Sequence, residues 1–336
     1  MSAAAAGGCR LLRLTILPAG SGGVAPGAGA VAAVAEIEVP ADSLLFAGHF
    51  PGRPVLPGIA HLALLLQVLA ALAERGELAA GAAIASVRSL RLRRIVAPGD
   101  RLTLRVDAAG SGEIRFQVHR GAGLASSGEV RLRGDDEPRA GAVRDGDPSS
   151  PSSPGDPGAW SLPIGTRGAP PGAAPSYPPV TRLLPHTPPA RLIAEVLAAG
   201  DAGIVCAATI SACHPLAVAG AVPGFVAIEL AAQAAAALHG LRSGGFGHPG
   251  VPPRHRAAAG AGGPPVGMLV GARHVCLPDS LAVDSALRVS VTLAGGATPL
   301  AVYQMELQTA VGPAGGGERL AAGTISTYLA SRSPDT

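Results

Sequence analysis

The sequence contains few of the residues on which several large classes of protein depend. Aromatic residues make up 3% of its 336 residues, and all 26 basic residues are arginine, because no lysine occurs. The 23 acidic residues nearly balance the arginines, and the formal charge of +3 is spread along the chain without a dense basic run. Nucleic-acid-binding proteins usually carry a clustered basic face. We therefore predict no nucleic-acid partner and no deep aromatic stacking site.

Paired cysteines and long apolar runs are also missing. No two cysteines form a CxxC pair, and none stands with histidine at metal-ligand spacing, so no metal site is predicted. The four cysteines are Cys9, Cys206, Cys213 and Cys276. The longest apolar stretch, Leu62 to Ala73, is interrupted by Gln67 and is too short for the roughly 20 residues that span a bilayer. The first residues lack the pattern of a signal peptide, so we expect a cytoplasmic protein without a membrane segment.

The length and the composition predict two domains. Hydrophobic residues account for 48% of the chain, and its 336 residues exceed the roughly 250 at which a single core stops growing. Residues 135–179 are rich in Pro, Gly, Ser and Asp and have no periodic apolar pattern, which is typical of a linker. The sequence therefore predicts an N-terminal domain over residues 1–134 and a C-terminal domain over residues 180–333.

Both predicted domains show the same order of patterns. In each, a turn-rich segment ending in Pro-Gly precedes an apolar helix pattern, and alternating strand-like runs follow. Gln67 lies nine residues after Gly58, and Gln233 lies nine residues after Gly224. The repeat predicts two copies of a helix followed by a largely antiparallel meander, with the helices beginning at the two glycines.

The most specific segment is His49 to Gly58, which reads HFPGRPVLPG. It resembles the active-site loop and helix start of the β-hydroxyacyl-acyl carrier protein dehydratases of fatty acid synthesis. The segment Arg93 to Val106 resembles a strand-turn-strand of the same family. The C-terminal domain is similar to the thioester dehydratases of aryl polyene pigment pathways, through the segments Leu183 to Leu192, Cys213 to Gln233 and Val266 to Val275. This resemblance implies an α+β double hot-dog fold, in which each domain wraps an antiparallel sheet around a central helix.

The resemblance also implies where the catalytic residues lie. In the family, a histidine stands on the loop before the helix, and a carboxylate stands on the helix five residues after the glycine. These positions are His49 in the N-terminal domain and Glu229 in the C-terminal domain, whereas the N-terminal helix has Ala63 at the carboxylate position. The family builds its site across a dimer interface, so the fused pair is expected to place His49 opposite Glu229 in one complete site.

Elementary chemistry explains why these residue types are suitable. Removal of water needs a base for the proton beside the thioester carbonyl, an acid for the departing hydroxyl and a donor for the enolate oxygen. The pKa of an imidazole lies near neutrality, and desolvation raises the pKa of a buried carboxyl, so that it can keep its proton. The backbone N–H groups of Gly58 and Gly224 are the candidate donors.

The remaining candidates have weaker patterns. His214 and Gly224 are expected to form a second or relic site, whose carboxylate position is Ala63. Gln67 and Gln233, each on the face of its own predicted helix, are expected to support the site by hydrogen bonds. His186 has a counterpart in the family, but the sequence gives it no chemical role, and His61 is expected to be a satisfied or surface residue.

The expected reaction is the conversion of a (3R)-3-hydroxyacyl thioester to the trans-2-enoyl thioester. No metal or redox cofactor is expected, and the substrate would be carried on the phosphopantetheine of acyl carrier protein. The internal pair of domains predicts a monomer or homodimer of chains. Two alternatives remain open: a hot-dog acyl thioesterase, in which Glu229 directs water at the carbonyl, and a non-catalytic acyl-binding or partner subunit of a dehydratase complex, which the loss at Ala63 favours.

Overall fold

The computed structural model describes residues 6–18, 31–78, 83–108, 112–134, 177–243, 267–297, 299–310 and 317–329. Each half of the chain forms one long α-helix, and each half contributes six strands to a single 12-stranded sheet. The elements of the first half are η1 (Ala6–Gly8), β1 (Arg10–Ile16), β2 (Val31–Glu38), η2 (Leu44–Phe46), α1 (Ala60–Glu74), β3 (Ile84–Leu92), β4 (Arg101–Ala108), β5 (Glu113–Arg120) and β6 (Gly123–Leu132). Those of the second half are η3 (Val180–Arg182), β7 (Ile193–Ala199), β8 (Gly203–Ala208), β9 (Ala221–Pro223), α2 (Val226–Ser243), β10 (Gly267–Cys276), β11 (Ser280–Ala282), β12 (Leu287–Ala297), β13 (Leu300–Thr309) and β14 (Arg319–Leu329).

The two helices form because their sequences favour helix and because each has a defined end. Both consist largely of Ala and Leu, which are strong helix formers. α1 ends where Gly76 takes a left-handed conformation with φ of 77°, and the N–H groups of Gly76 and Glu77 bond back to the carbonyls of Ala73 and Leu72. α2 is buried on nearly every side, as expected for a helix surrounded by its sheet.

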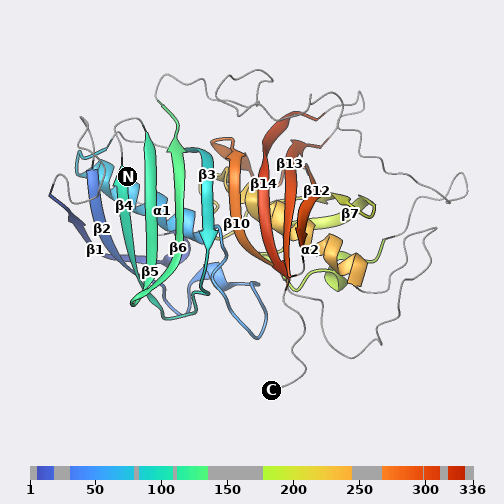
Figure 1. Cartoon of the computed structure of the whole chain (residues 1–336), viewed down its shortest axis with the longest axis horizontal. Helices are drawn as coiled ribbons and strands as arrows, with labels where there is room; N and C mark the ends of the chain where they lie inside the picture. Colours follow the sequence, from blue (N-terminus) through green and yellow to red (C-terminus); the bar gives the residue numbers. More distant parts are fainter. Residues whose placement is uncertain are drawn as a thin grey trace, which may run out of the picture.

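The order of the strands is the same in both halves. From its outer edge to the centre, the first half reads β1-β2-β4-β5-β6-β3, and the second reads β7-β8-β12-β13-β14-β10. The antiparallel pair β3 and β10 joins the halves, with Leu90 opposite Ala272. The chain therefore repeats one fold about a pseudo-twofold axis at this junction, and each helix lies behind the strands of its own half (Figure 1). This is the double hot-dog arrangement, so the predicted fold class is confirmed.

The meander prediction was incomplete. In both halves two strands of the 12-stranded sheet precede the helix, β1 and β2 in the first and β7 and β8 in the second, and they lie at its two outer edges. The short strand β9, which pairs with β11 in a separate sheet, also precedes α2. The helices also begin two residues after the glycines rather than at them, at Ala60 and Val226. Most of the predicted linker, residues 135–176, lies outside the described residues, so the domain boundaries stay predictions.

The core is built mainly from aliphatic side chains, as the composition predicts. Buried Ala, Leu, Val and Ile dominate it, and among the described residues Phe116, Phe225 and Tyr303 are the largest fully buried side chains. In the part of the chain that the structure describes, no helix is both long and apolar enough to cross a membrane.

Candidate active site

His49 lies on the loop that follows η2, and its ring is held by the same loop. The side chain is 8% exposed, and its Nδ1 lies 2.8 Å from the carbonyl oxygen of Val55. A carbonyl can only accept, so Nδ1 carries the hydrogen and donates it to Val55, which leaves the lone pair on Nε2. The backbone supports this geometry, because the Val55 N–H donates to the carbonyl of His49. His49 is therefore oriented as a base that accepts a proton at Nε2.

Glu229 stands in the first turn of α2, where it is 6% exposed. Gln233, one turn later, donates from Nε2 to Glu229 Oε1 at 3.0 Å. Gln233 is itself fixed, because Nε2 also donates to the Ala190 carbonyl at 2.8 Å and Oε1 accepts from the Leu192 N–H at 2.9 Å. The bonds of Gln233 thus fix one oxygen of Glu229 and leave Oε2 available to a substrate.

His186 is the neighbour to which sequence reasoning assigned no chemical role. It lies on the loop between η3 and β7, is 4% exposed, and its Nε2 lies 3.7 Å from Glu229 Oε1. Its ring centroid is 5.2 Å from that of His49 and 4.8 Å from that of Phe50. Burial, and then the charge of His49, lowers the pKa of His186 to about 3, so its imidazole is neutral at physiological pH. A histidine among the prolines of residues 185–189 is the feature of the sequence that could have indicated this position.

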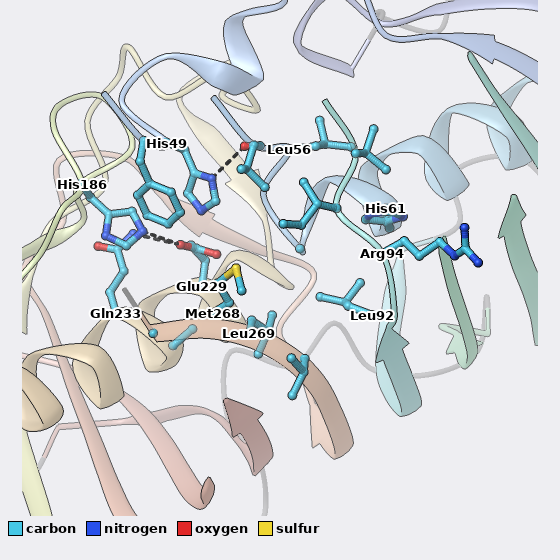
Figure 2. A pocket seen from close by; sticks show the side chains of 18 of the residues that line it. His49, Leu56, His61, Leu92, Arg94, His186, Glu229, Gln233, Met268 and Leu269 are labelled. Carbon is cyan, nitrogen blue, oxygen red and sulfur yellow. Dashed lines mark hydrogen bonds and ion pairs between the residues drawn. The ribbon is translucent and has the colours of Figure 1, made fainter. Parts of the chain in front are cut away.

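A pocket connects these side chains with an apolar wall. His49, His186 and Glu229 lie at one end, and Arg94 and His61 lie at the other (Figure 2). The cavity measures about 130 Å³. Its lining residues are His49, Phe50, Val55, Leu56, Gly58, His61, Leu92, Arg93, Arg94, Ile95, Val96, His186, Glu229, Ala232, Gln233, Gly267, Met268, Leu269 and Val270. Both halves of the chain line it, so neither half forms this pocket alone.

Gly58 also lines the pocket, and a side chain at this position would fit only if the neighbouring leucine side chains shifted. A Cβ at this position would lie 2.5 Å from Leu92 Cδ1 and 3.1 Å from Leu269 Cδ2. Among the described residues, no hydrogen bond engages the Gly58 N–H. The geometry leaves this N–H available to a ligand in the pocket.

The pair expected to form a second site has different surroundings. Neither His214 nor Gly224 lines the pocket. The Gly224 N–H already donates to the carbonyl of Asp279 at 3.2 Å, and His214 Nδ1 accepts from the Leu216 N–H at 3.2 Å. Burial lowers the pKa of His214 to about 4. With its donor occupied and Ala63 at its carboxylate position, this pair lacks two of the three groups that elimination needs.

The expectation that Gln67 supports the site is wrong. Its Nε2 donates to the Cys9 carbonyl at 3.3 Å, and it does not line the pocket. Position 63, one turn earlier on α1, is alanine and offers no carboxylate to bond. Gln67 therefore holds the N-terminal segment against α1. His61 is buried and satisfied as expected, because its Nδ1 lies 2.9 Å from Ser126 Oγ, and it also lines the pocket.

His49, His186 and Glu229 could also hold a metal ion by geometry. One ligand atom from each lies within 4.8 Å of the others, and two imidazoles with a carboxylate suit transition metals. His49 and Glu229 are also the candidate base and acid of an elimination, so a metal bound here would compete with that chemistry. The prediction of a metal-free site stays a prediction.

Comparisons with known proteins agree with this division into two halves. Residues 28–129 match the family of ApeI dehydratases, and residues 178–335 match the family of ApeP dehydratases. The 3-hydroxyacyl-[acyl-carrier-protein] dehydratase FabZ of Moorella thermoacetica is 36% identical over 99 residues, which are 29% of this chain and 67% of that protein. The FabZ of Thermomicrobium roseum is 35% identical over 106 residues, or 31% of this chain and 69% of that protein.

The chain belongs to the hot-dog dehydratase superfamily.

Solved structures of dehydratase domains resemble this chain over nearly its whole length. The dehydratase domain of PpsC from Mycobacterium tuberculosis matches with a TM-score of 0.54 at 14% identity, over 94% of this chain and 97% of that one. A trans-AT polyketide synthase dehydratase domain from Brevibacillus brevis matches with a TM-score of 0.54 at 12% identity, over 89% of this chain and 94% of that one. At these identities the match shows the fold alone, and it runs across both halves.

Proposed function

We propose that the chain dehydrates a (3R)-3-hydroxyacyl thioester carried on acyl carrier protein, with His49 as base and Glu229 as acid. The observation that carries the proposal is that these two side chains, from different halves of the chain, line one pocket. The product would be the trans-2-enoyl thioester, in fatty acid or polyene biosynthesis. Membership of the dehydratase superfamily supports the reaction class, and the roles of the individual residues are inferred from the geometry.

The first half of the reaction uses His49 and Gly58. Nε2 of His49 takes the proton from the carbon beside the thioester carbonyl, and the Nδ1–H bond to Val55 stabilises the resulting imidazolium. The electrons of the broken C–H bond move toward the carbonyl oxygen, where the Gly58 N–H is available as a donor. The free N–H of Gly58 and the absence of a side chain there both suit this role.

The second half uses Glu229. Since Gln233 donates to Oε1, the acidic proton is placed on Oε2 and passes to the 3-hydroxyl as its bond to carbon breaks. Water leaves, the double bond forms, and Glu229 remains as a carboxylate beside an imidazolium at His49. Transfer of one proton from His49 to Glu229 restores the starting state.

The carrier is inferred from charge. Arg93 and Arg94 are exposed and line the pocket, so a positive surface lies where an acidic carrier protein could deliver its arm. The FabZ relatives are named as acyl-carrier-protein dehydratases. Replacing both arginines with alanine should raise KM for acyl carrier protein substrates and leave KM for a short pantetheine thioester unchanged. An equal change for both substrates would contradict the docking role.

Mass spectrometry of the purified chain with 3-hydroxyacyl carrier proteins tests the reaction. Loss of water from the acyl group is expected, and a chelator should leave the rate unchanged if no metal is needed. Release of free thiol without an enoyl product would instead identify a thioesterase. Binding without any turnover would identify a non-catalytic acyl-binding or partner subunit. Light scattering tests the accompanying expectation of a monomer or homodimer.

A further inference from the structure

His186 is a buried polar side chain that the proposed reaction leaves without a task. It is 4% exposed, and its Nδ1 is buried with no hydrogen-bond partner among the described residues. Its Nε2 points toward Glu229, 3.7 Å from Oε1 (Figure 2). Buried polar groups are nearly always bonded, so a buried histidine whose Nδ1 is unpaired and whose Nε2 faces a candidate catalytic carboxyl needs an explanation.

The loop that carries His186 is fixed on both sides. The N–H of Thr187, the next residue, donates to the carbonyl of Gly48 at 3.1 Å, which ties this loop to the loop of His49. Further along, Ala190 and Leu192 are bonded to the Gln233 side chain. The ring of His186 is therefore held in place by the same network that holds the base and the acid.

The surroundings of the ring decide which nitrogen carries its hydrogen. The imidazole is neutral, because burial and the charge of His49 lower the pKa of His186 to about 3. A buried N–H without an acceptor is rarer and costlier than a buried lone pair. Nδ1 has no partner, whereas Nε2 faces an acceptor, so the hydrogen belongs on Nε2. A small side-chain shift would close the 3.7 Å separation to hydrogen-bond length in the substrate complex.

This arrangement aims two N–H groups at one oxygen. Gln233 Nε2 lies 3.0 Å from Glu229 Oε1, and His186 Nε2 approaches the same atom. Both donors favour the carboxylate that remains after Oε2 has delivered its proton. A charged His186 would repel the imidazolium that forms on His49, 5.2 Å away between ring centroids, but a neutral donor does not.

We propose that His186 is a positioning residue, whose Nε2–H acts with Gln233 to hold Glu229 Oε1 and to stabilise the carboxylate formed during dehydration. The inference rests on the proposed function. It assigns His186 no contact with the substrate, so its removal should affect the chemical step and not substrate binding.

Two substitutions separate the donor from the ring. His186→Phe keeps the apolar ring volume and removes the donor, and it should lower kcat about 10- to 100-fold, as expected for a lost hydrogen bond to a charged group, with KM nearly unchanged. His186→Gln places an amide N–H near the position of Nε2 and should recover most of kcat. If His186→Phe does not fold, as judged by thermal unfolding, His186→Leu serves in its place.

The outcomes distinguish this inference from the proposed function. Normal kcat in the donor-free variant would overturn the positioning role, as would a His186→Gln variant no better than His186→Phe, or a change in KM alone. Glu229→Gln is measured in the same assay. If it dehydrates normally, the proposed function fails. If it is inactive while His186→Phe is normal, only the role of His186 fails.

Discussion

Two side chains from opposite halves of the chain face one pocket, and each has one free atom for proton transfer: Nε2 of His49 and Oε2 of Glu229. Substitutions His49→Ala and Glu229→Gln should each lower the dehydration rate by typically about 10²- to 10⁴-fold, because they remove the base and the acid of one reaction. The double variant should be little worse than either single variant. Steady-state kinetics with a 3-hydroxyacyl thioester measures all three.

His214 provides the matched control for these variants. It is equally buried, at 8% exposed, but it does not line the pocket, and its Nδ1 accepts from the Leu216 N–H. His214→Ala should therefore change the rate much less than His49→Ala. Equal damage from the two substitutions would show that the single shared site is the wrong description.

His61 should make the stability of the protein depend on pH. Burial lowers the pKa of His61 to about 4 from an ordinary 6.5. Between these values the unfolded chain binds a proton that folded His61 does not, so the free energy of unfolding falls as the pH falls, by up to about 1.4 kcal/mol per pH unit. His61→Phe should reduce this slope between about pH 6.5 and pH 4 in urea unfolding.

A surface histidine is the control for that slope. His274 is exposed and has a φ of 48°, a backbone conformation that asparagine tolerates, so His274→Asn should leave the slope unchanged. Equal slopes in the wild type and His61→Phe would mean that His61 is not the titrating group.

The sequence predicted the two central residues of this site but not all of the residues that support them. The HFPG motif and the position five residues after each glycine led to His49 and Glu229, which the structure brings to one pocket. His186 could not be assigned, because its place beside Glu229 depends on a loop that folds back onto α2. The supporting role of Gln67 was wrong, because its side chain bonds to the Cys9 carbonyl and position 63, one turn earlier, is alanine and not a carboxylate.

At the scale of elements, the segment just before α1, which contains Gly58, shapes the pocket. A Cβ on Gly58 would meet the ends of Leu92 and Leu269, which are flexible and belong to β3 and β10. Gly58→Ala should therefore leave the protein folded but narrow the pocket and shift the N–H, which should lower kcat/KM about 10- to 100-fold. Thermal unfolding and kinetics of the variant check both parts.

Gly200 provides a matched control, because the same substitution of glycine by alanine can be made there. It connects β7 and β8, a Cβ there would meet no atom of the described residues within 4 Å, and no left-handed φ is required. Gly200→Ala should retain full activity. If Gly58→Ala is equally active, space at this glycine does not limit the reaction.

Element prediction succeeded where the patterns were strong. Ala- and Leu-rich runs gave both helices to within two residues of their starts, and alternating residues indicated the strands after them. The strands before the two helices, β1, β2, β7 and β8, were missed. In β2, β7 and β8 alanine stands at buried and at partly exposed positions alike, and β1 is mostly exposed, so their sequences show no clear alternation of apolar and polar residues.

At the scale of the whole molecule, the two halves form one continuous sheet. β3 pairs with β10, and Arg133 from the first half forms an ion pair with Asp279 and donates to the Leu277 carbonyl at 3.1 Å in the second. The pseudo-twofold arrangement follows from sequence repetition, but the two halves differ at single positions, such as Ala63 in the first half and Glu229 at the corresponding place in the second. Under the proposed function, this symmetric fold therefore carries an asymmetric set of catalytic groups.

This asymmetry predicts how the molecule behaves when it is divided. Polypeptides covering residues 1–134 and 177–336 should each be inactive, because His49 lies on one and Glu229 on the other. Mixed together, they should regain dehydration through the β3 and β10 pairing, as measured by loss of water from the acyl group. Full-length His49→Ala mixed with full-length Glu229→Gln should stay inactive, because each chain closes its own pocket with one defective partner. Activity in that second mixture would show that the complete site forms between chains and not within one.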